Sequence, residues 1–353
     1  MTKNNNIRAF FELVRAGLWE KKARLSLFGE VDYGKIMRLA EEQSMDGLVT
    51  AGLEHVVDVT VPQEVLLQFI GTSLQIEQRN TAMNKFIAEM IEKMRQEGIY
   101  TLLVKGQGIA QCYERPLWRV SGDVDLLLSN DNYEKAKEFL LPLSSSQKRE
   151  EQYSKHLGLS IDPWYIEIHG SLRSGLSERV DKEIDKAQRD VFYGGNVRSW
   201  ENGSVQVFLP GLDDDVFFVF THFIKHFYKE GLGLRQVCDW CRLLWTYREK
   251  VDVKLLETRL RRAGLMSEWR GFAAVAVDYL RMPEEAMPFY DSKFKSKGTR
   301  IVKLILSGYS GNKYKDTLRI MRIYPWNTMK FLPGILWHLN WLKVKERVFG
   351  SNE

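Results

Sequence analysis

The sequence predicts an α+β protein: a small mixed β-sheet core flanked by N-terminal and C-terminal helical regions. Residues 7–97 carry apolar side chains at the three- and four-residue spacings of amphipathic helices. Short runs rich in β-branched and aromatic residues follow between residues 99 and 209. From residue 213 onward the helical spacing returns. We therefore divide the chain into a helical region (1–84), an α/β core (85–212) and a second helical region with a basic tail (213–353).

Length and composition are those of an ordinary globular protein, with 353 residues, 44% hydrophobic and 27% charged. The chain has no apolar run of the roughly 18 residues that a membrane-spanning helix needs, and its N-terminus lacks the features of a secretory signal. Three cysteines give no basis for a disulfide framework, so we expect a reducing, cytoplasmic environment. Cys238 and Cys241 have CxxC spacing within a helical pattern, which favours buried thiols over a redox site.

The core region contains the segments that we expect to form strands. Ile99–Val104 is a nearly continuous apolar run, suited to a buried strand, and Lys105–Gly108 follows as a turn into a short helix. Val124–Leu128 is expected to be the second strand, with a helix over Asn130–Leu141 after it. The remaining strands are expected at His156–Ile161, Trp164–His169 and Val205–Leu209.

Positive charge is concentrated at the C-terminus. Residues 291–353 contain 13 Lys or Arg against 4 Asp or Glu, although the net charge of the whole chain is only +5. Lys343, Lys345 and Arg347 lie near Trp337 and Trp341, and basic residues among aromatics can contact a polyanion such as nucleic acid or an anionic membrane surface. A solvated helix with a packed aromatic face is the alternative, and the sequence favours it.

Two aspartates have the spacing of a metal site. Asp123 and Asp125 stand at the start of a strand, where alternation places both side chains on one face. Carboxylates this close need a counter-charge. A divalent cation such as Mg²⁺ or Mn²⁺ would supply it, since hard cations bind carboxylate oxygens together with substrate phosphates. An exposed strand end is the alternative, because Asp-x-Asp pairs are common.

The neighbouring segments supply groups suited to a phosphorylated substrate. Glycines in Lys105–Gly108 would let the backbone approach a phosphate at a helix start, and Lys105 adds positive charge. Arg119, just before Gly122, is a further candidate for a phosphate contact. On the later strand Glu167 and His169 share one face, and a third carboxylate there would complete a site for two-metal phosphoryl chemistry. Each piece alone also fits a plain structural role, such as a glycine-rich turn, a surface arginine or a solvated strand face.

As a set, these residues are more specific. The series Lys-Gly, Arg, Gly-Asp-x-Asp-Leu and Glu-x-His resembles the DNA polymerase beta-like nucleotidyltransferase superfamily. More narrowly, it resembles a bacterial family of uncharacterised nucleotidyltransferases. The resemblance covers roughly residues 85–245, with weaker similarity at His222–His226 and Arg235–Asp239. His222 and His226 lack the glutamate of the zinc-protease pattern HExxH, so core or supporting roles are favoured for them. Arg235 and Asp239 have the spacing of an ion pair within a helix.

The resemblance implies a metal-dependent transfer of a nucleoside monophosphate from a nucleoside triphosphate, ATP among them, to a hydroxyl of an acceptor. It implies that Asp123, Asp125 and Glu167 bind the metal and carry the catalysis, with Glu167 as a candidate base. It also implies a nucleotide site at Lys105, Gly106, Gln107, Arg119 and Gly122.

One departure from the superfamily concerns the phosphate turn. The superfamily usually has Gly-Ser where this chain has Gly106-Gln107, so the phosphate contact of the serine must come from Lys105, Gln107 or backbone amides. The departure leaves open a non-catalytic nucleotide- or nucleic-acid-binding protein on the same fold. The acceptor stays open as well, among small molecules, proteins and nucleic acids.

Overall fold

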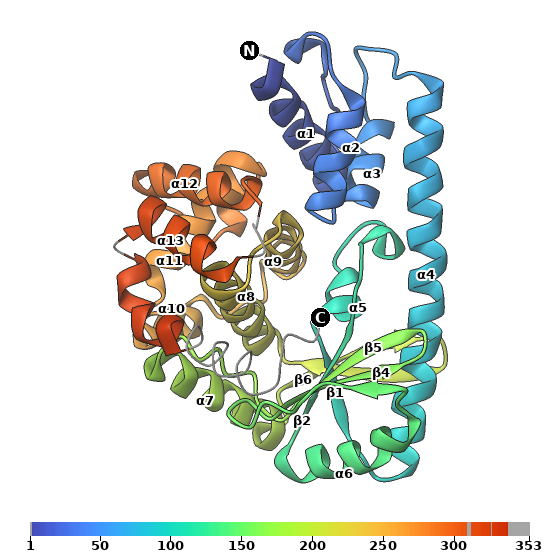
Figure 1. Cartoon of the computed structure of the whole chain (residues 1–353), viewed down its shortest axis with the longest axis vertical. Coiled ribbons are helices and arrows are strands. Elements are labelled where there is room, and N and C mark those ends of the chain that lie inside the picture. Colours follow the sequence, from blue (N-terminus) through green and yellow to red (C-terminus); the bar gives the residue numbers. More distant parts are fainter. Residues whose placement is uncertain (1, 309–311, 326, 338–353) are drawn as a thin grey trace.

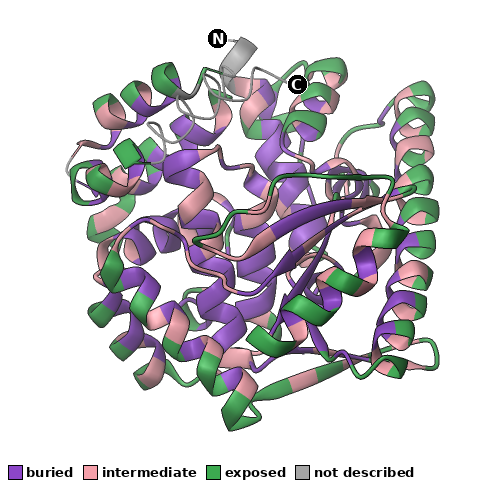
Figure 2. Ribbon diagram, turned by 60° about the horizontal axis from the view of Figure 1, so that its bottom comes forward, coloured by how far each residue is buried: buried purple, intermediate pink, exposed green. Residues whose placement is uncertain are grey.

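A computed structural model describes residues 2–308, 312–325 and 327–337. It confirms the α+β class, with a five-stranded mixed sheet that follows an N-terminal group of helices and precedes a C-terminal group along the chain (Figure 1). Buried residues form a larger cluster, mainly among the helices before and after the sheet, and a smaller cluster between the sheet and its neighbouring helices, whereas the outer helix faces are exposed (Figure 2). None of the helices described is both long and apolar enough to cross a membrane. The basic residues Lys343, Lys345 and Arg347 lie outside the described residues, as does Trp341.

The helices that precede the sheet are α1 (Thr2–Trp19), α2 (Tyr33–Glu42), α3 (Asp46–Glu54) and α4 (Gln63–Gln96). Helices α1 and α3 pack closely because glycines lie at their crossing. A Cβ atom on Gly17 would lie 2.0 Å from the Leu48 carbonyl oxygen, and one on Gly52 equally close to that of Leu13. Helix α4 joins the two halves of the molecule: Phe69 packs in the core of the N-terminal helices, and its second half packs against the sheet.

The main sheet has the strand order β1-β2-β5-β4-β3. Its first pair is antiparallel, its central pair β2–β5 is parallel, and β5–β4 and β4–β3 are antiparallel. The strands are β1 (Thr101–Val104), β2 (Val124–Leu128), β3 (Ser146–Gln147), β4 (His156–Ile161) and β5 (Trp164–His169). Four of these five were expected from the sequence, and β3 is a two-residue edge strand that was not. The short helix α5 (Gly106–Ala110) follows β1, and α6 (Asn130–Leu140) follows β2.

The segment after β5 differs most from the expectation. Helix α7 (Glu178–Gly194) was not predicted, although Val180, Ile184, Ala187 and Val191 form its buried stripe. Strand β7 (Val205–Pro210) was expected, but it pairs with the unpredicted β6 (Val197–Asn202) in a separate two-stranded sheet. Strand β6 is rich in polar residues, so its apolar pattern is weak, whereas the apolar stripe of α7 has regular helical spacing and was overlooked.

The C-terminal helices begin with α8 (Leu212–Lys229), whose aromatic side chains Phe217, Phe220 and Phe223 are fully buried. The first turn of α8 contains three acids, Asp213, Asp214 and Asp215. In the structure Asp214 and Asp215 are buried and form ion pairs with Arg259 and Arg198. All three cysteines are free and buried, as expected. The later helices are α9 (Leu234–Thr246), α10 (Val253–Ala263), α11 (Met266–Ala274), α12 (Lys295–Leu306) and α13 (Lys313–Ile323).

Candidate active site

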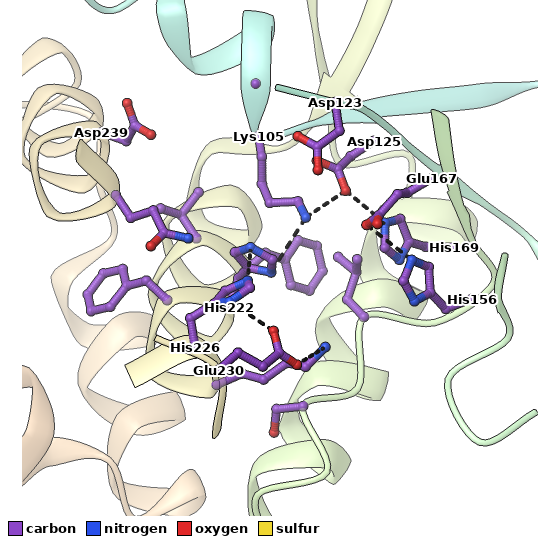
Figure 3. A pocket seen from close by; sticks show the side chains of 18 of the residues that line it. Lys105, Asp123, Asp125, His156, Glu167, His169, His222, His226, Glu230 and Asp239 are labelled. Carbon is purple, nitrogen blue, oxygen red and sulfur yellow. Dashed lines mark hydrogen bonds and ion pairs between the residues drawn. The ribbon is translucent and has the colours of Figure 1, made fainter. Parts of the chain in front are cut away.

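A cavity of about 340 Å³ separates the carboxylate-bearing strands from helix α8 (Figure 3). Strands β2, β4 and β5 supply acids and histidines to one wall, and α8 supplies histidines and a lysine to the other. Basic and acidic side chains are nearly equal in number around this cavity. The wall contains five basic residues, Lys105, Arg119, Arg173, Lys225 and Arg235, and six acidic ones, Asp123, Asp125, Glu151, Glu167, Glu230 and Asp239. A cavity with so many charged side chains suits a small charged ligand better than an apolar one.

Three carboxylates converge at this cavity. Asp125 and Glu167 are direct partners in the parallel pairing of β2 and β5. Asp123 lies just before β2. One carboxylate oxygen from each of the three acids lies within 4.8 Å of the other two. The expectation that Glu167 joins the two aspartates on one sheet face is therefore confirmed. Such a group of hard oxygen donors suits Mg²⁺ or Mn²⁺.

The three acids affect one another, as the sequence led us to expect. The charge of Asp125, together with burial, raises the pKa of Asp123. Burial would also raise the pKa of Asp125, but the Lys105 ammonium and the hydrogen bond from His169 lower it far below its usual value. At Glu167 burial likewise acts upward, and the neighbouring His156 outweighs it and lowers the pKa. Asp123 is thus the acid of this group that accepts a proton most readily.

Lys105 is held between the acids and α8. Its Nζ lies 2.7 Å from Asp125 Oδ1 and donates to His222 Nδ1 at 3.5 Å. Burial acts against its charge, but Asp125 and Asp123 outweigh burial and raise the pKa of Lys105. Its backbone has φ 59° and ψ −144°, a conformation that non-glycine residues rarely adopt. The ammonium therefore lies close to where a cation bound to Asp125 would lie.

The predicted phosphate turn is only partly turned toward the cavity. Gly106 and Gly122 line it, and Gly106 has a positive φ of 42°. Gln107 is 1% exposed, and its Nε2 donates to Asn80 Oδ1, away from the cavity. Any ligand contact by Gln107 must therefore come from its backbone. Helix α5 has only five residues, so its dipole adds little to anion binding.

Arg119 lines the cavity, but its guanidinium is already engaged. Its Nε and Nη2 donate to the two carboxylate oxygens of Asp239, each at 2.7 Å, and both side chains are buried. Tyr113 Oη donates to Asp239 as well, at 2.8 Å. The expected helix pair of Arg235 with Asp239 does not form as an ion pair, and Arg235 donates instead to the carbonyl oxygen of Val120. Arg119 thus connects the loop before β2 to α9.

Two histidines lie beside the acids on the sheet. His169 was expected to share a sheet face with Glu167; it is only 8% exposed, and its Nε2 donates to Asp125 Oδ1 at 2.8 Å. Burial lowers the pKa of His169 to about 4, so its ring is neutral at neutral pH. His156, on the next strand, stacks on His169 with ring centroids 4.6 Å apart. Sequence reasoning missed His156, because nothing in its own segment marks it as a site residue.

The α8 wall carries a series of hydrogen bonds that starts at Lys105. His222 Nε2 lies 2.9 Å from His226 Nε2, and His226 Nδ1 lies 2.9 Å from Glu230 Oε2 (Figure 3). Burial lowers the pKa of His222 well below its usual value, so this ring is neutral and can accept from Lys105. The sequence shows that His222, His226 and Glu230 are spaced to share one helix face. It does not show that this face lies opposite the carboxylates.

Comparison with known proteins identifies the family. The sequence model of the family described as uncharacterised nucleotidyltransferase matches residues 29–281, which is most of the chain. No curated protein and no solved structure matches significantly. The chain belongs to this nucleotidyltransferase family, whose reaction type is the transfer of a phosphorus-containing group.

Proposed function

From its membership of this family, we propose that the protein transfers a nucleoside monophosphate from a nucleoside triphosphate, such as ATP, to a hydroxyl of an acceptor, and that it needs a divalent metal. The observation that supports this most directly is the convergence of Asp123, Asp125 and Glu167 at one wall of the cavity. Three acids on two neighbouring strands are costly to keep together without a cation. The five basic side chains around the same cavity fit a metal–triphosphate ligand.

The donor set fits Mg²⁺ or Mn²⁺. Asp123, Asp125 and Glu167 offer only carboxylate oxygens, which these hard cations prefer. When bound, the metal neutralises charge on the phosphates and on the departing pyrophosphate. Lys105, whose ammonium lies 2.7 Å from Asp125 Oδ1, would bind a phosphate oxygen, and the backbone at Gly106 would approach the same group.

The chain's own residues also account for the proton. The acceptor hydroxyl attacks the α-phosphorus, the bond to the β-phosphate oxygen breaks, and the hydroxyl proton passes to the Glu167 carboxylate. The lowered pKa of Glu167 keeps it ionised and so able to act as this base. Arg119, held by Asp239, contributes positive charge at the cavity wall without leaving its ion pair. Catalysis on these terms depends mainly on positioning and charge.

The test is to incubate the protein with Mg²⁺ and each of the four labelled nucleoside triphosphates, with and without cell extract. We expect label to enter an acceptor, together with release of pyrophosphate, and we expect Asp123→Asn with Asp125→Asn to abolish both. Triphosphate binding without any transfer in the presence of extract would favour the non-catalytic binding protein. Absence of metal-dependent triphosphate binding would reject the proposed function.

A further inference from the structure

We propose that His156, His169 and Glu167 form a second cation site, which takes a borderline transition-metal ion such as Zn²⁺ and adjoins the carboxylate site. The proposal rests on the proposed function in one respect, since Glu167 is assigned to both sites. All three side chains line the cavity. Their donor atoms lie within 4.8 Å of one another, as do those of the three carboxylates.

The separations fit a shared ion. Glu167 Oε2 lies 3.0 Å from His156 Nε2 and 3.7 Å from His169 Nε2. Donors at about 2.0–2.2 Å from a tetrahedral ion lie roughly 3.3–3.6 Å from one another. The two measured separations lie on either side of that range. The two rings would have to turn out of their stacked arrangement so that their nitrogens converge on one ion.

The backbone fixes this arrangement. His156 and His169 are direct partners in the antiparallel pairing of β4 and β5, and Glu167 lies two residues before His169 on the same sheet face. The two rings stack nearly parallel, with 5° between their planes (Figure 3). Side chains on strands are held more accurately than side chains on loops. The three donors are thus placed together before any ligand binds.

His156 Nε2 is buried, and its near neighbour is Glu167 Oε2 at 3.0 Å, a contact that is favourable only when this nitrogen carries a proton. His169 Nε2 currently donates to Asp125 Oδ1, so a cation would replace that proton and His169 would carry its proton on Nδ1. A cation between the two nitrogens and the carboxylate would satisfy His156 Nε2 without that proton.

The donor chemistry separates the two sites. Imidazole nitrogen favours Zn²⁺ and similar ions, whereas carboxylate and water suit Mg²⁺ and Mn²⁺. Two histidines and one glutamate bind Zn²⁺ with one position left open for water or substrate. With Glu167 shared, the two cations would be neighbours, as in two-metal sites whose ions lie about 3.5–4 Å apart. The open position would face the cavity, where the acceptor must enter.

The experiment loads the full-length protein with Zn²⁺, dialyses it against excess Mg²⁺, and measures retained zinc by elemental analysis. The wild-type protein should retain about one Zn²⁺ per chain. His156→Gln and His156→Ala should weaken Zn²⁺ binding by more than tenfold, since loss of a direct ligand exceeds the roughly 10–100-fold effect of losing a supporting contact. His55→Ala is the matched control, because His55 pairs with Glu20 outside the cavity and this variant should retain zinc.

Asp123→Asn separates this proposal from the proposed function. It should abolish Mg²⁺ binding in calorimetry and leave zinc retention unchanged, because Asp123 belongs to the carboxylate site alone. Three outcomes would overturn the second site: displacement of zinc by Mg²⁺, retention of zinc by His156→Gln, and loss of zinc from Asp123→Asn. Unchanged Mg²⁺ binding in Asp123→Asn would count against the proposed function and would leave the zinc result standing.

Discussion

Asp125 on β2 lies directly beside Glu167 on β5, and the Asp125 carboxylate is also bound by Lys105 and His169. A buried acid is expensive unless its charge is balanced and its oxygens are hydrogen-bonded. Asp125 meets this requirement in part through its contacts with Lys105 and His169. At Asp123 the charge of Lys105 does not outweigh the charge of Asp125 and burial, so the pKa of Asp123 stays raised. Asp123 is therefore the acid of the group that would gain most from a bound cation.

The first prediction concerns both aspartates. Asp123→Asn with Asp125→Asn should abolish Mg²⁺-dependent triphosphate binding in calorimetry, because only Glu167 would remain as a charged ligand. The circular dichroism spectrum should stay that of the folded protein. Glu138→Gln is the control, since Glu138 is exposed on α6 away from the cavity and its loss should leave binding unchanged. Normal binding by the double variant would place the metal elsewhere.

The second prediction concerns pH. The raised pKa of Asp123 means that Mg²⁺ affinity should fall on acidification at a higher pH than it would for an ordinary aspartate. The Lys105 ammonium lowers the pKa of both Asp123 and Asp125. Lys105→Met should therefore move the fall in affinity to still higher pH, measured as Mg²⁺ affinity against pH. Lys182→Met on the exposed face of α7 is the control, and a Lys105→Met profile that coincides with it would contradict the electrostatic assignment.

The carboxylate wall could be predicted from the sequence, because its signals are local. Strand alternation places the side chains of Asp123 and Asp125 on the same face of one strand, and those of Glu167 and His169 on the same face of another. The family resemblance then joins the two strands. His156 could not be found in this way, since its role depends on which residue of β5 it faces, and a shift of one position would turn it to the other side of the sheet.

The opposite wall shows where local patterns fail. His222, His226 and Glu230 have clear helix spacing, but only the packing of α8 places them across the cavity from the acids. Similarly, Gln107 was a reasonable candidate for a phosphate contact by position in the turn. Its burial against Asn80 depends on helix α4, which lies far from it in the sequence. Sequence patterns therefore predicted the local elements of the site but not the contacts between segments that are distant in the sequence.

The third prediction concerns the turn after β1. Gly106 and Gly98 both have positive φ, at 42° and 68°, and an added Cβ would meet no close atom at either position. Alanine at each should therefore cost a similar amount of stability, about 1–2 kcal/mol, from backbone strain. Only Gly106 lines the cavity, so only Gly106→Ala should also weaken triphosphate binding, and Gly106→Val should weaken it further. Equal triphosphate affinity in Gly106→Ala and Gly98→Ala, measured by calorimetry, would make the turn purely structural.

The last prediction concerns the ion pair that connects the loop before β2 to α9. Asp239 accepts two hydrogen bonds from Arg119 and one from Tyr113, and Arg119 and Asp239 are both buried. Asp239→Ala should lower the free energy of unfolding by about 3–5 kcal/mol, because it leaves a buried guanidinium without a counter-charge. The double variant Arg119→Met with Asp239→Leu should lose less stability, since it removes both charges.

Urea-induced unfolding measures the free energy of unfolding of each variant. Glu178→Ala, which breaks an exposed helix pair with Lys182, should leave stability essentially unchanged. If Asp239→Ala behaves like Glu178→Ala, the Arg119–Asp239 pair is not what holds the loop before β2 against α9.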